Sequence, residues 1–363
     1  MAHKKLSLTG RLSAAGLLGL LSFWIAPAWS AEPEDIWAGL AKLSGAERQK
    51  RLLAGARSEG KVVFYTNLSG DHLERLRQDF EGRFQVTLES WRASGEKTAN
   101  RFLTEGRSGK STADVVTPSN EHVVSLIRAG LVGIYHSPER SFYSEPNRDR
   151  EGYWTSHDNN MAIMAYNTRM VPAAEAPKKY EDFLSPKWKG NFALDMDPDK
   201  ALMGWLKTWG EEKTRKFLQG LMKNDLAVRK GHTLAAQLLC AGEFKAAIDL
   251  YIYRVADLKY DKKCPVEIVY PDPTPGAVGP LVAAKRAPHP HGAALLTDYI
   301  LSEAGQKLLA SLGRLSGRRG IKPKYPDMDF EGRGVRVLLL TPEDTEKLDR
   351  KYQQLREEFL LNR

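Results

Sequence analysis

Residues 60–84 read GKVVFYTNLSGDHLERLRQDFEGRF and decide the fold class of this chain. A short apolar strand at residues 62–64 runs into a polar loop at residues 65–71. The helix expected after the loop has one apolar face, made by Leu73, Leu76, Phe80 and Phe84. In open α/β sheets, ligands bind at the carboxyl ends of strands, where such loops and helix N-termini meet. The stretch therefore predicts an α/β protein with a binding loop after its first strand.

The rest of the chain continues this alternation of strands and helices. Further strands are expected at residues 85–91, 113–116, 161–166, 192–194, 226–228, 246–251, 266–270 and 278–284. Helices are expected between them, and the chain should end in an amphipathic helix at residues 341–361. The Pro-rich stretch at residues 271–275 suits a crossing between two lobes. This alternation predicts an α/β fold with mixed sheets.

The first 30 residues have the pattern of a secretory signal peptide. Basic residues precede an apolar run at residues 17–25, and Ala28 and Ser30 place small side chains at positions −3 and −1 of a cleavage site. The run is well short of the ~20 residues that span a bilayer, so a cleaved signal is preferred over a membrane anchor. We therefore expect a periplasmic protein whose mature chain begins at Ala31.

The charge and the motifs of the chain exclude two classes of function. The formal net charge is +9, but the basic excess is spread along the chain rather than gathered in one tract. We therefore expect no nucleic-acid partner and only a mild attraction for anions. The motifs Gly-x-Ser-x-Gly, His-Glu-x-x-His and Gly-x-x-x-x-Gly-Lys-Ser/Thr are absent, so we expect a protein that is not an enzyme.

The chain has two cysteines, Cys240 and Cys264. In an oxidising compartment an even pair suggests a disulfide bond. The alternative is two separate buried thiols. A zinc site is not expected, because the spacings that zinc favours, such as Cys-x-x-Cys, are missing.

Five stretches resemble, in order along the chain, those of one known family. They are EGKVVFYT at residues 59–66, ADVV at 113–116, GYW at 152–154 with YNT at 166–168, LSPKWKG at 184–190, and APHP at 287–290 with LSEAGQ at 301–306. With these motifs the chain resembles the periplasmic solute-binding proteins of ABC importers. The branch is the ferric-iron-type, or family 1, extracellular solute-binding proteins, and the resemblance covers about residues 36–361.

The resemblance implies a type II fold with two lobes, in which two mixed sheets are joined by two crossing strands. A ligand is then held between the lobes, by closure about the hinge, and delivered to a membrane permease. The implied organisation is a signal peptide (1–30), a helical lead-in (31–57), lobe 1 (58–156 and 277–335), lobe 2 (157–276) and a C-terminal helix (336–363). We expect a monomer with no resident cofactor.

Ferric-iron binding is the alternative that the resemblance raises. Relatives that bind iron use a His after the first strand, a Glu after the Ala-Asp-Val strand and two adjacent Tyr in the second lobe. Here those positions fall near Leu68 and at Ser119, with His72 and Glu121 a few residues beyond. The tyrosines appear as Tyr251-Ile252-Tyr253, whose phenols would share one face of a strand. Fe(III) needs several anionic oxygens, so an anionic solute is preferred. The alternative metal ligands are Tyr251, Tyr253, His72 and Glu121.

The candidate ligand-binding residues follow the ends of the expected strands. They are Tyr65, Asn67, Ser69, Ser94, Gly95, Ser119, Asn120, Asp158, Asn159, Arg229, Thr233, Tyr251 and Tyr253. Hydroxyls, amides and free backbone N–H groups before a helix suit a carboxylate, phosphate or phosphonate. The serines can equally serve as helix caps, and Arg229 can form a surface ion pair.

These features together predict the periplasmic substrate-binding component of an ABC transporter. Its ligand is expected to be a small anionic solute, such as an organic carboxylate, a phosphate ester or a phosphonate.

Overall fold

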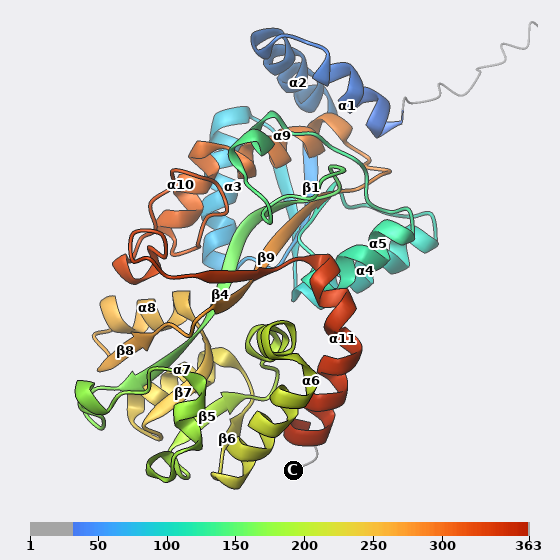
Figure 1. Ribbon diagram of the computed structural model, residues 1–363. Coiled ribbons are helices and arrows are strands. Elements are labelled where there is room, and N and C mark those ends of the chain that lie inside the picture. Colours follow the sequence, from blue (N-terminus) through green and yellow to red (C-terminus); the bar gives the residue numbers. More distant parts are fainter. Residues whose placement is uncertain (1–31, 362–363) are drawn as a thin grey trace, which may run out of the picture. The chain divides into compact units, whose positions relative to one another are not determined.

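Two long strands, β4 (Thr155–Asn167) and β9 (Thr274–Ala283), pair antiparallel and join the two lobes of the protein (Figure 1). The structure is a computed structural model, and it describes residues 32–361. The signal peptide expected at residues 1–30 lies outside the described residues. Both lobes share the crossing pair, because the strand order β2-β1-β3-β9-β4-β7-β5-β6 runs through it. The predicted α/β class with two crossing strands is confirmed.

In lobe 1, β1 (Lys61–Thr66) lies between β2 (Thr87–Arg92) and β3 (Val115–Val116), and all three strands are parallel. Their carboxyl ends therefore lie at one edge of the sheet, where three helices begin. The helices of lobe 1 are α1 (Pro33–Ala41), α2 (Gly45–Glu59), α3 (Gly70–Phe84), α4 (Gly95–Arg107), α5 (Asn120–Arg128), α9 (Pro290–Leu301) and α10 (Glu303–Ser311). One continuous apolar core, which includes Phe64, Phe80 and Leu296, holds these elements together.

In lobe 2, β7 (Ala246–Tyr251) pairs antiparallel with β4, and β5 (Phe192–Asp195) and β6 (Ala227–Arg229) follow in parallel. A further strand, β8 (Val266–Val269), pairs with β4. The helices of lobe 2 are α6 (Asp199–Lys223), α7 (His232–Ala241) and α8 (Ile252–Tyr260). The central strands β5 and β7 are buried on both faces and form nearly continuous apolar runs, whereas β8 alternates between buried and half-buried residues.

Neighbouring residues of these strands enter two different cores. Phe192 and Leu194 of β5 pack into one core, and Ala193 packs into the other. Successive side chains of a strand point to opposite faces, which explains the division. The sheet of lobe 2 therefore carries helices on both sides and presents the carboxyl ends of β5 and β7 to the crossing strands.

The C-terminal part of the chain differs from the sequence-based expectation. The C-terminal unit expected at residues 336–363 contains the helix expected at residues 341–361, but β10 (Val337–Leu340) first pairs with β9. Only then does α11 (Pro342–Arg356) begin, followed by one π-helical turn (Glu357–Leu361). Tyr325, Met328 and Phe330, expected in lobe 1, pack into a core of lobe 2 instead. Near the C-terminus, the chain therefore passes between the two lobes more often than the sequence motifs indicate.

Two elements are longer than expected. The strand expected at residues 161–166 is β4, which begins six residues earlier, and the helix expected at residues 201–209 is α6, which continues to Lys223 across an interruption at Gly210. Gly210 has φ of 79°, a conformation that glycine adopts without steric cost. Short 3-10 helices occur at Pro138–Phe142, Ala173–Glu175, Tyr180–Leu184, Pro186–Trp188 and Pro326–Met328. Among residues 32–361, no helix has the length and apolar character needed to cross a membrane.

The predicted disulfide between Cys240 and Cys264 is confirmed. Their Cα atoms lie 5.5 Å apart, and the sulfur atoms are bonded. The bond joins the end of α7 to the segment that enters β8. It closes a loop with a sequence separation of 24 within lobe 2.

Loss of this disulfide should destabilise the protein. In the chain-entropy description, closing a loop of this length contributes about 3 kcal/mol to the free energy of unfolding. We expect a Cys240→Ser/Cys264→Ser variant to lose that amount in urea denaturation, and the wild type in reductant to match it. The variant itself should not respond to reductant. Equal stability of the wild type with and without reductant would contradict the expectation.

Candidate functional site

Three helix N-termini meet at the carboxyl edge of the lobe 1 sheet. Helices α3, α4 and α5 are preceded by Ser69, Ser94 and Ser119 at their N-cap positions. A hydrogen bond connects the loop before α3 with the loop before α5, because the backbone N–H of Asn67 donates to Thr117 Oγ1 at 3.1 Å. A Cβ atom on Gly95 would lie only 2.7 Å from the Ser119 nitrogen, so glycine permits this close approach. The three N-termini give this wall of lobe 1 a positive potential.

One cavity lined by both lobes has a volume of about 460 Å³. We call it the basic cavity. Asn67, Ser69 and His72 line it from lobe 1, and Tyr253 lines it from lobe 2. Its charged residues are four cations, Arg92, Arg254, Arg314 and Lys324, against two carboxylates, Asp71 and Asp257. The excess of positive charge beside the N-terminus of α3 makes this cavity suited to an anion.

Two residues of the basic cavity, Arg314 and His72, have contacts that bear on ligand binding. Arg314 forms an ion pair with Asp158 of the crossing strand, and its guanidinium lies over the ring of Tyr253, 5.3 Å from the centroid. His72 Nδ1 is buried and makes no hydrogen bond among residues 32–361. Burial lowers the pKa of His72, so its imidazole is neutral at neutral pH. The cavity therefore combines fixed cations with a buried imidazole nitrogen that has no hydrogen-bond partner among the described residues.

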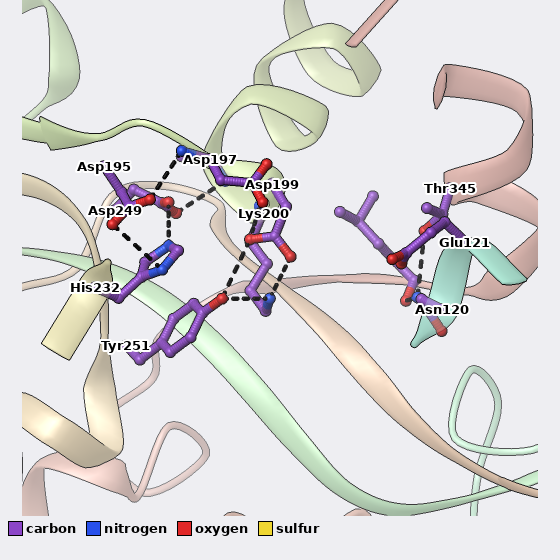
Figure 2. Close-up of polar contacts among 12 residues, drawn as sticks. Asn120, Glu121, Asp195, Asp197, Asp199, Lys200, His232, Asp249, Tyr251 and Thr345 are labelled. Carbon is purple, nitrogen blue, oxygen red and sulfur yellow. Dashed lines mark hydrogen bonds and ion pairs between the residues drawn. The ribbon is translucent and has the colours of Figure 1, made fainter. Parts of the chain in front are cut away.

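The second cavity, which we call the acidic cavity, has a volume of about 520 Å³. Lobe 1 contributes the start of α5, lobe 2 the start of α6, and α11 forms a third wall. Five carboxylates line it, from Glu96, Glu121, Asp197, Asp199 and Asp349. The permanent cations here are Lys200 and Arg356. Figure 2 shows Asn120 and Glu121 on one side of this region and Asp199 and Lys200 on the other.

Behind Lys200, polar side chains of lobe 2 form a hydrogen-bonded group that we call the lobe 2 cluster: Asp195, Asp199, Lys200, His232, Asp249 and Tyr251 (Figure 2). His232 Nε2 lies 2.9 Å from Asp249 Oδ2, and the ring of His232 stacks on that of Tyr251 with centroids 3.8 Å apart. The Lys200 ammonium contacts Asp199 Oδ2 at 2.6 Å and Tyr251 Oη at 3.3 Å. The cluster thus holds three carboxylates around one lysine, one imidazole and one phenol.

Asp249 reaches the cluster because of an irregularity in β7. The register between β4 and β7 shifts between Ile163 and Ala165, and Asp249 has φ of 60°. A β-bulge of this kind redirects a side chain, and aspartate is among the few residues that tolerate the left-handed region. The Asp249 carboxylate is therefore fully buried and also accepts the Ala201 amide at the start of α6.

In the lobe 2 cluster, burial and the neighbouring charges shift the pKa of His232 in opposite directions. Burial raises the pKa of the Asp249 carboxyl and of Asp195. For His232, burial alone would lower the pKa, but the hydrogen bond to Asp249 and the nearby carboxylates raise it. Asp195 Oδ2 lies 3.6 Å from His232 Nδ1 and makes no hydrogen bond among the described residues. His232 therefore retains its proton between two carboxylates above the pH at which a free histidine loses it.

Helix α11 connects the two lobes beside the acidic cavity. Asn120 of lobe 1 donates from Nδ2 to the Leu340 carbonyl oxygen at 3.0 Å and to Thr345 Oγ1 at 3.2 Å. From the same helix, Tyr352 donates to Asp197 of lobe 2, and Arg356 Nε lies 3.2 Å from Asp197 Oδ1. The C-terminal helix thus holds the start of α6 and the start of α5 in one arrangement.

Some of the predicted site residues meet in these cavities. Asn67, Ser69 and Tyr253 line the basic cavity, Asn120 lines the acidic cavity, and Tyr251 belongs to the lobe 2 cluster. Asn67, Ser69, Asn120 and Tyr253 follow the end of a strand, and Tyr251 is the last residue of β7. Their contact with a solute stays a prediction.

The other predicted residues have partners elsewhere. Tyr65 is buried in β1, and its hydroxyl donates to Glu105 Oε1 at 2.9 Å, away from both cavities. Ser94 accepts the Lys97 amide as a helix cap, and Ser119 Oγ lies 3.0 Å from His122 Nδ1.

Asp158 and Asn159 were expected before the crossing strand but lie within β4. Arg229 pairs with Glu243 at the surface, and Thr233 is exposed in the first turn of α7. These two residues contact neither cavity. An arginine after a strand therefore indicates a ligand only weakly, since a surface carboxylate satisfies it equally well.

The alternative metal set does not converge. His72 and Tyr253 line the basic cavity, whereas Glu121 lines the acidic one. The expectation that Tyr251 and Tyr253 share a strand is wrong, because β7 ends at Tyr251 and α8 begins at Ile252. Their rings are still near each other, with centroids 6.0 Å apart. Within residues 32–361, the carboxylate and imidazole ligand atoms that do converge are those of Asp199, His232 and Asp249, which lie within 4.8 Å of one another.

Several residues of the site were missed by sequence reasoning. Asp195 is the last residue of β5, and Asp199 and Lys200 open α6, so the rule that selected Ser69 also applies to them. Arg314 and Asp249 carried no such signal, because one follows a helix and the other lies inside a strand.

Comparison with known proteins supports this fold. A sequence model of the family described as "Bacterial extracellular solute-binding protein" matches residues 111–327. A curated relative, the "Fe(3+)-binding periplasmic protein" of Serratia marcescens, is 23% identical over 211 residues, which are 56% of this chain and 60% of that protein. The chain thus spans about 60% of the length of this relative.

Solved structures with the same fold include proteins with different ligands. Iron-bound HitA from Pseudomonas aeruginosa superposes with a TM-score of 0.72 at 19% identity, covering 82% of this chain and 99% of that one. AfuA from Actinobacillus pleuropneumoniae, solved with exogenous fructose-6-phosphate bound, gives a TM-score of 0.68 at 19% identity, covering 84% and 99%. These similarities confirm the predicted two-lobe fold.

The dependence of His232 on Asp249 can be tested by NMR titration. In an Asp249→Asn variant, we expect the pKa of His232 to fall, because the carboxylate that opposes the effect of burial is gone. His289 is the internal control, since its pKa is raised by the hydrogen bond that its ring donates to Asp114 rather than by this cluster. An unchanged His232 pKa would show that Asp249 does not hold the proton there.

Proposed function

Because the chain belongs to the family of bacterial extracellular solute-binding proteins, we propose that it is the substrate-binding component of an ABC importer. It captures a small anionic solute between its lobes and delivers it, unchanged, to a permease in the inner membrane. The site of action is the periplasm, reached with the signal peptide expected at residues 1–30. The protein acts as a monomer and needs no nucleic acid and no resident cofactor.

The observation that carries this proposal is the charge of the basic cavity. Four cationic side chains, the N-terminus of α3 and His72, whose buried Nδ1 has no hydrogen-bond partner among residues 32–361, line one space between the lobes. A carboxylate or phosphate group placed there would receive charge-assisted hydrogen bonds from Arg92 or Arg254. Ser69 and Asn67 supply additional hydrogen-bonding groups from the lobe 1 wall.

The acidic cavity favours the opposite end of such a solute. Carboxylates accept hydrogen bonds from hydroxyl or ammonium groups, and Asp197 and Asp199 face the cavity beside Lys200. A solute that carries an anionic group at one end and hydrogen-bond donors at the other would match both cavities. Phosphate esters and hydroxylated organic acids have this pattern.

A second candidate function is Fe(III) binding. It is favoured by the iron-binding relative and by the carboxylates and phenol of the lobe 2 cluster. The metal would then be the transported solute. Its ligands would come from Asp199, His232, Asp249 and Tyr251, rather than from the four residues expected from the family pattern.

Native mass spectrometry of protein purified without refolding, followed by a thermal-shift screen, separates the two candidates. We expect an organic anion to be retained and to raise the melting temperature. At 100 times its dissociation constant a solute adds about 2.7 kcal/mol to the free energy of unfolding. A screen in which Fe(III) raises the melting temperature and no organic anion does would overturn the proposal.

Replacing a cation of the basic cavity should weaken solute binding without unfolding the protein. Arg254 makes a partly exposed ion pair with Asp257, at 3.3 Å, and its guanidinium lies 5.8 Å from the centroid of the Tyr253 ring. We expect Arg254→Met to lower the affinity for the retained anion by roughly 10- to 100-fold, because a charge-assisted hydrogen bond contributes about 1.5–3 kcal/mol.

The matched control for that measurement is Arg229→Met. Arg229 is also partly exposed and ion-paired, but it lies outside both cavities. Isothermal titration calorimetry should give the control the affinity of the wild type. An equal loss of affinity in both variants would indicate a general charge effect rather than a site.

A further inference from the structure

The lobe 2 cluster has the donors of a metal site. Ligand atoms of Asp199, His232 and Asp249 lie within 4.8 Å of one another. Tyr251 Oη lies 3.5 Å from Asp199 Oδ1, and Asp195 Oδ2 is buried near His232 with no hydrogen bond among the described residues. Carboxylate, imidazole and phenolate groups are ligands for Zn(II), Mn(II) and Fe(III).

A lysine of the protein itself lies where a cation would neutralise this cluster. The Lys200 ammonium is 2.6 Å from Asp199 Oδ2, 3.3 Å from Tyr251 Oη and 4.6 Å from the centroid of the Tyr251 ring. The Lys200 side chain is only 9% exposed. An ammonium group is a compact point charge, and buried carboxylates require such a partner. Figure 2 shows this ammonium joined to both Asp199 and Tyr251.

The position of Lys200 in its helix supports a role in the cluster. Lys200 is the second residue of α6, at the end where the helix dipole disfavours a positive charge. The preference for acidic residues at this end is met by Asp199 alone. The contacts with Asp199 and Tyr251 therefore have to compensate the unfavourable placement of the lysine.

We propose that the Lys200 ammonium serves as the built-in cation of a site formed by Asp199, His232, Asp249 and Tyr251, and that Lys200 thereby excludes metal ions and determines the class of solute. With Lys200 in place, an incoming metal meets a fixed positive charge and an occupied carboxylate. Lys200 also lines the acidic cavity, where its third ammonium proton is available to a polar solute. The statement about solute class rests on the proposed function, whereas the exclusion of metals does not.

Substitution of Lys200 by a neutral residue should create a metal site. We expect Lys200→Met to bind Zn(II) or Mn(II) at least roughly 100-fold more tightly than the wild type, since one unit charge at a few ångströms is removed. Isothermal titration calorimetry with each metal salt measures this change. With Fe(III), the variant should in addition develop the visible charge-transfer band of a tyrosinate ligand. Lys200→Arg keeps the charge and should bind metals as weakly as the wild type.

Lys207→Met is the matched control, because Lys207 lies on the same helix and pairs with Asp344 outside the cluster. Its metal affinity should equal that of the wild type. If Lys200→Met is too unstable to study, Lys200→Gln makes the same prediction, and thermal melting of each variant confirms that it is folded.

Two results would overturn the inference. The first is a folded Lys200→Met or Lys200→Gln variant with no gain in metal affinity. The second is a wild-type protein that already binds the metals as tightly as these variants. If the variants gain metal binding but no organic anion binds the wild type, then the inference stands and the proposed function fails.

Discussion

The binding region depends on the antiparallel pairing of β4 with β9, the two strands that connect the lobes. Met161 lies opposite Gly276, and Asp158 lies opposite Gly279. A Cβ atom on either glycine would overlap the side chain opposite it, so only glycine lets the two strands pair at these positions. The space over Gly279 is what Asp158 occupies when it reaches Arg314. The hinge strands thus also carry the ion pair that limits the basic cavity.

The positions of the charged groups in the binding region follow from the pairing of the two crossing strands. Strand ends and helix starts of both lobes meet at the crossing pair, which brings their polar groups to one region. Within it, the cations gather around Arg254 and Arg314, and the carboxylates gather around Asp197 and Asp199. A solute with charge at one end only would therefore bind in one orientation. Closure of the lobes, the mode of motion of such folds, would bury both ends of it.

The sequence predicted the fold better than it predicted the site. Apolar periodicity and strand-end loops located β1, α3 and β7, because these depend on neighbouring residues alone. The same reasoning selected Ser69, which follows a strand, and Tyr251, which is the last residue of one, but it also selected Arg229, for which a surface carboxylate is available. Features that depend on neighbouring residues of the chain could be predicted, whereas features that depend on a contact partner elsewhere in the fold could not.

The residues that sequence reasoning missed depend on contacts between distant segments. Asp249 enters the lobe 2 cluster through a bulge that is defined by its pairing with β4. Arg314 becomes part of the cavity only because Asp158 of the hinge attracts it. Helix α11 was predicted as a helix, but nothing in its own pattern shows that it contacts both lobes through Thr345 and Tyr352.

A crystal structure of the protein with the solute that it retains from the cell would show directly whether an anionic solute binds between the lobes. We predict an anionic group in the basic cavity near Ser69 and Arg254, with hydroxyl or ammonium groups of the same solute toward Asp199. The Lys200 ammonium should remain in contact with Asp199 and Tyr251. A metal ion bound between Asp199, His232 and Asp249, with Lys200 displaced, would contradict both the anionic solute and the exclusion of metals by Lys200.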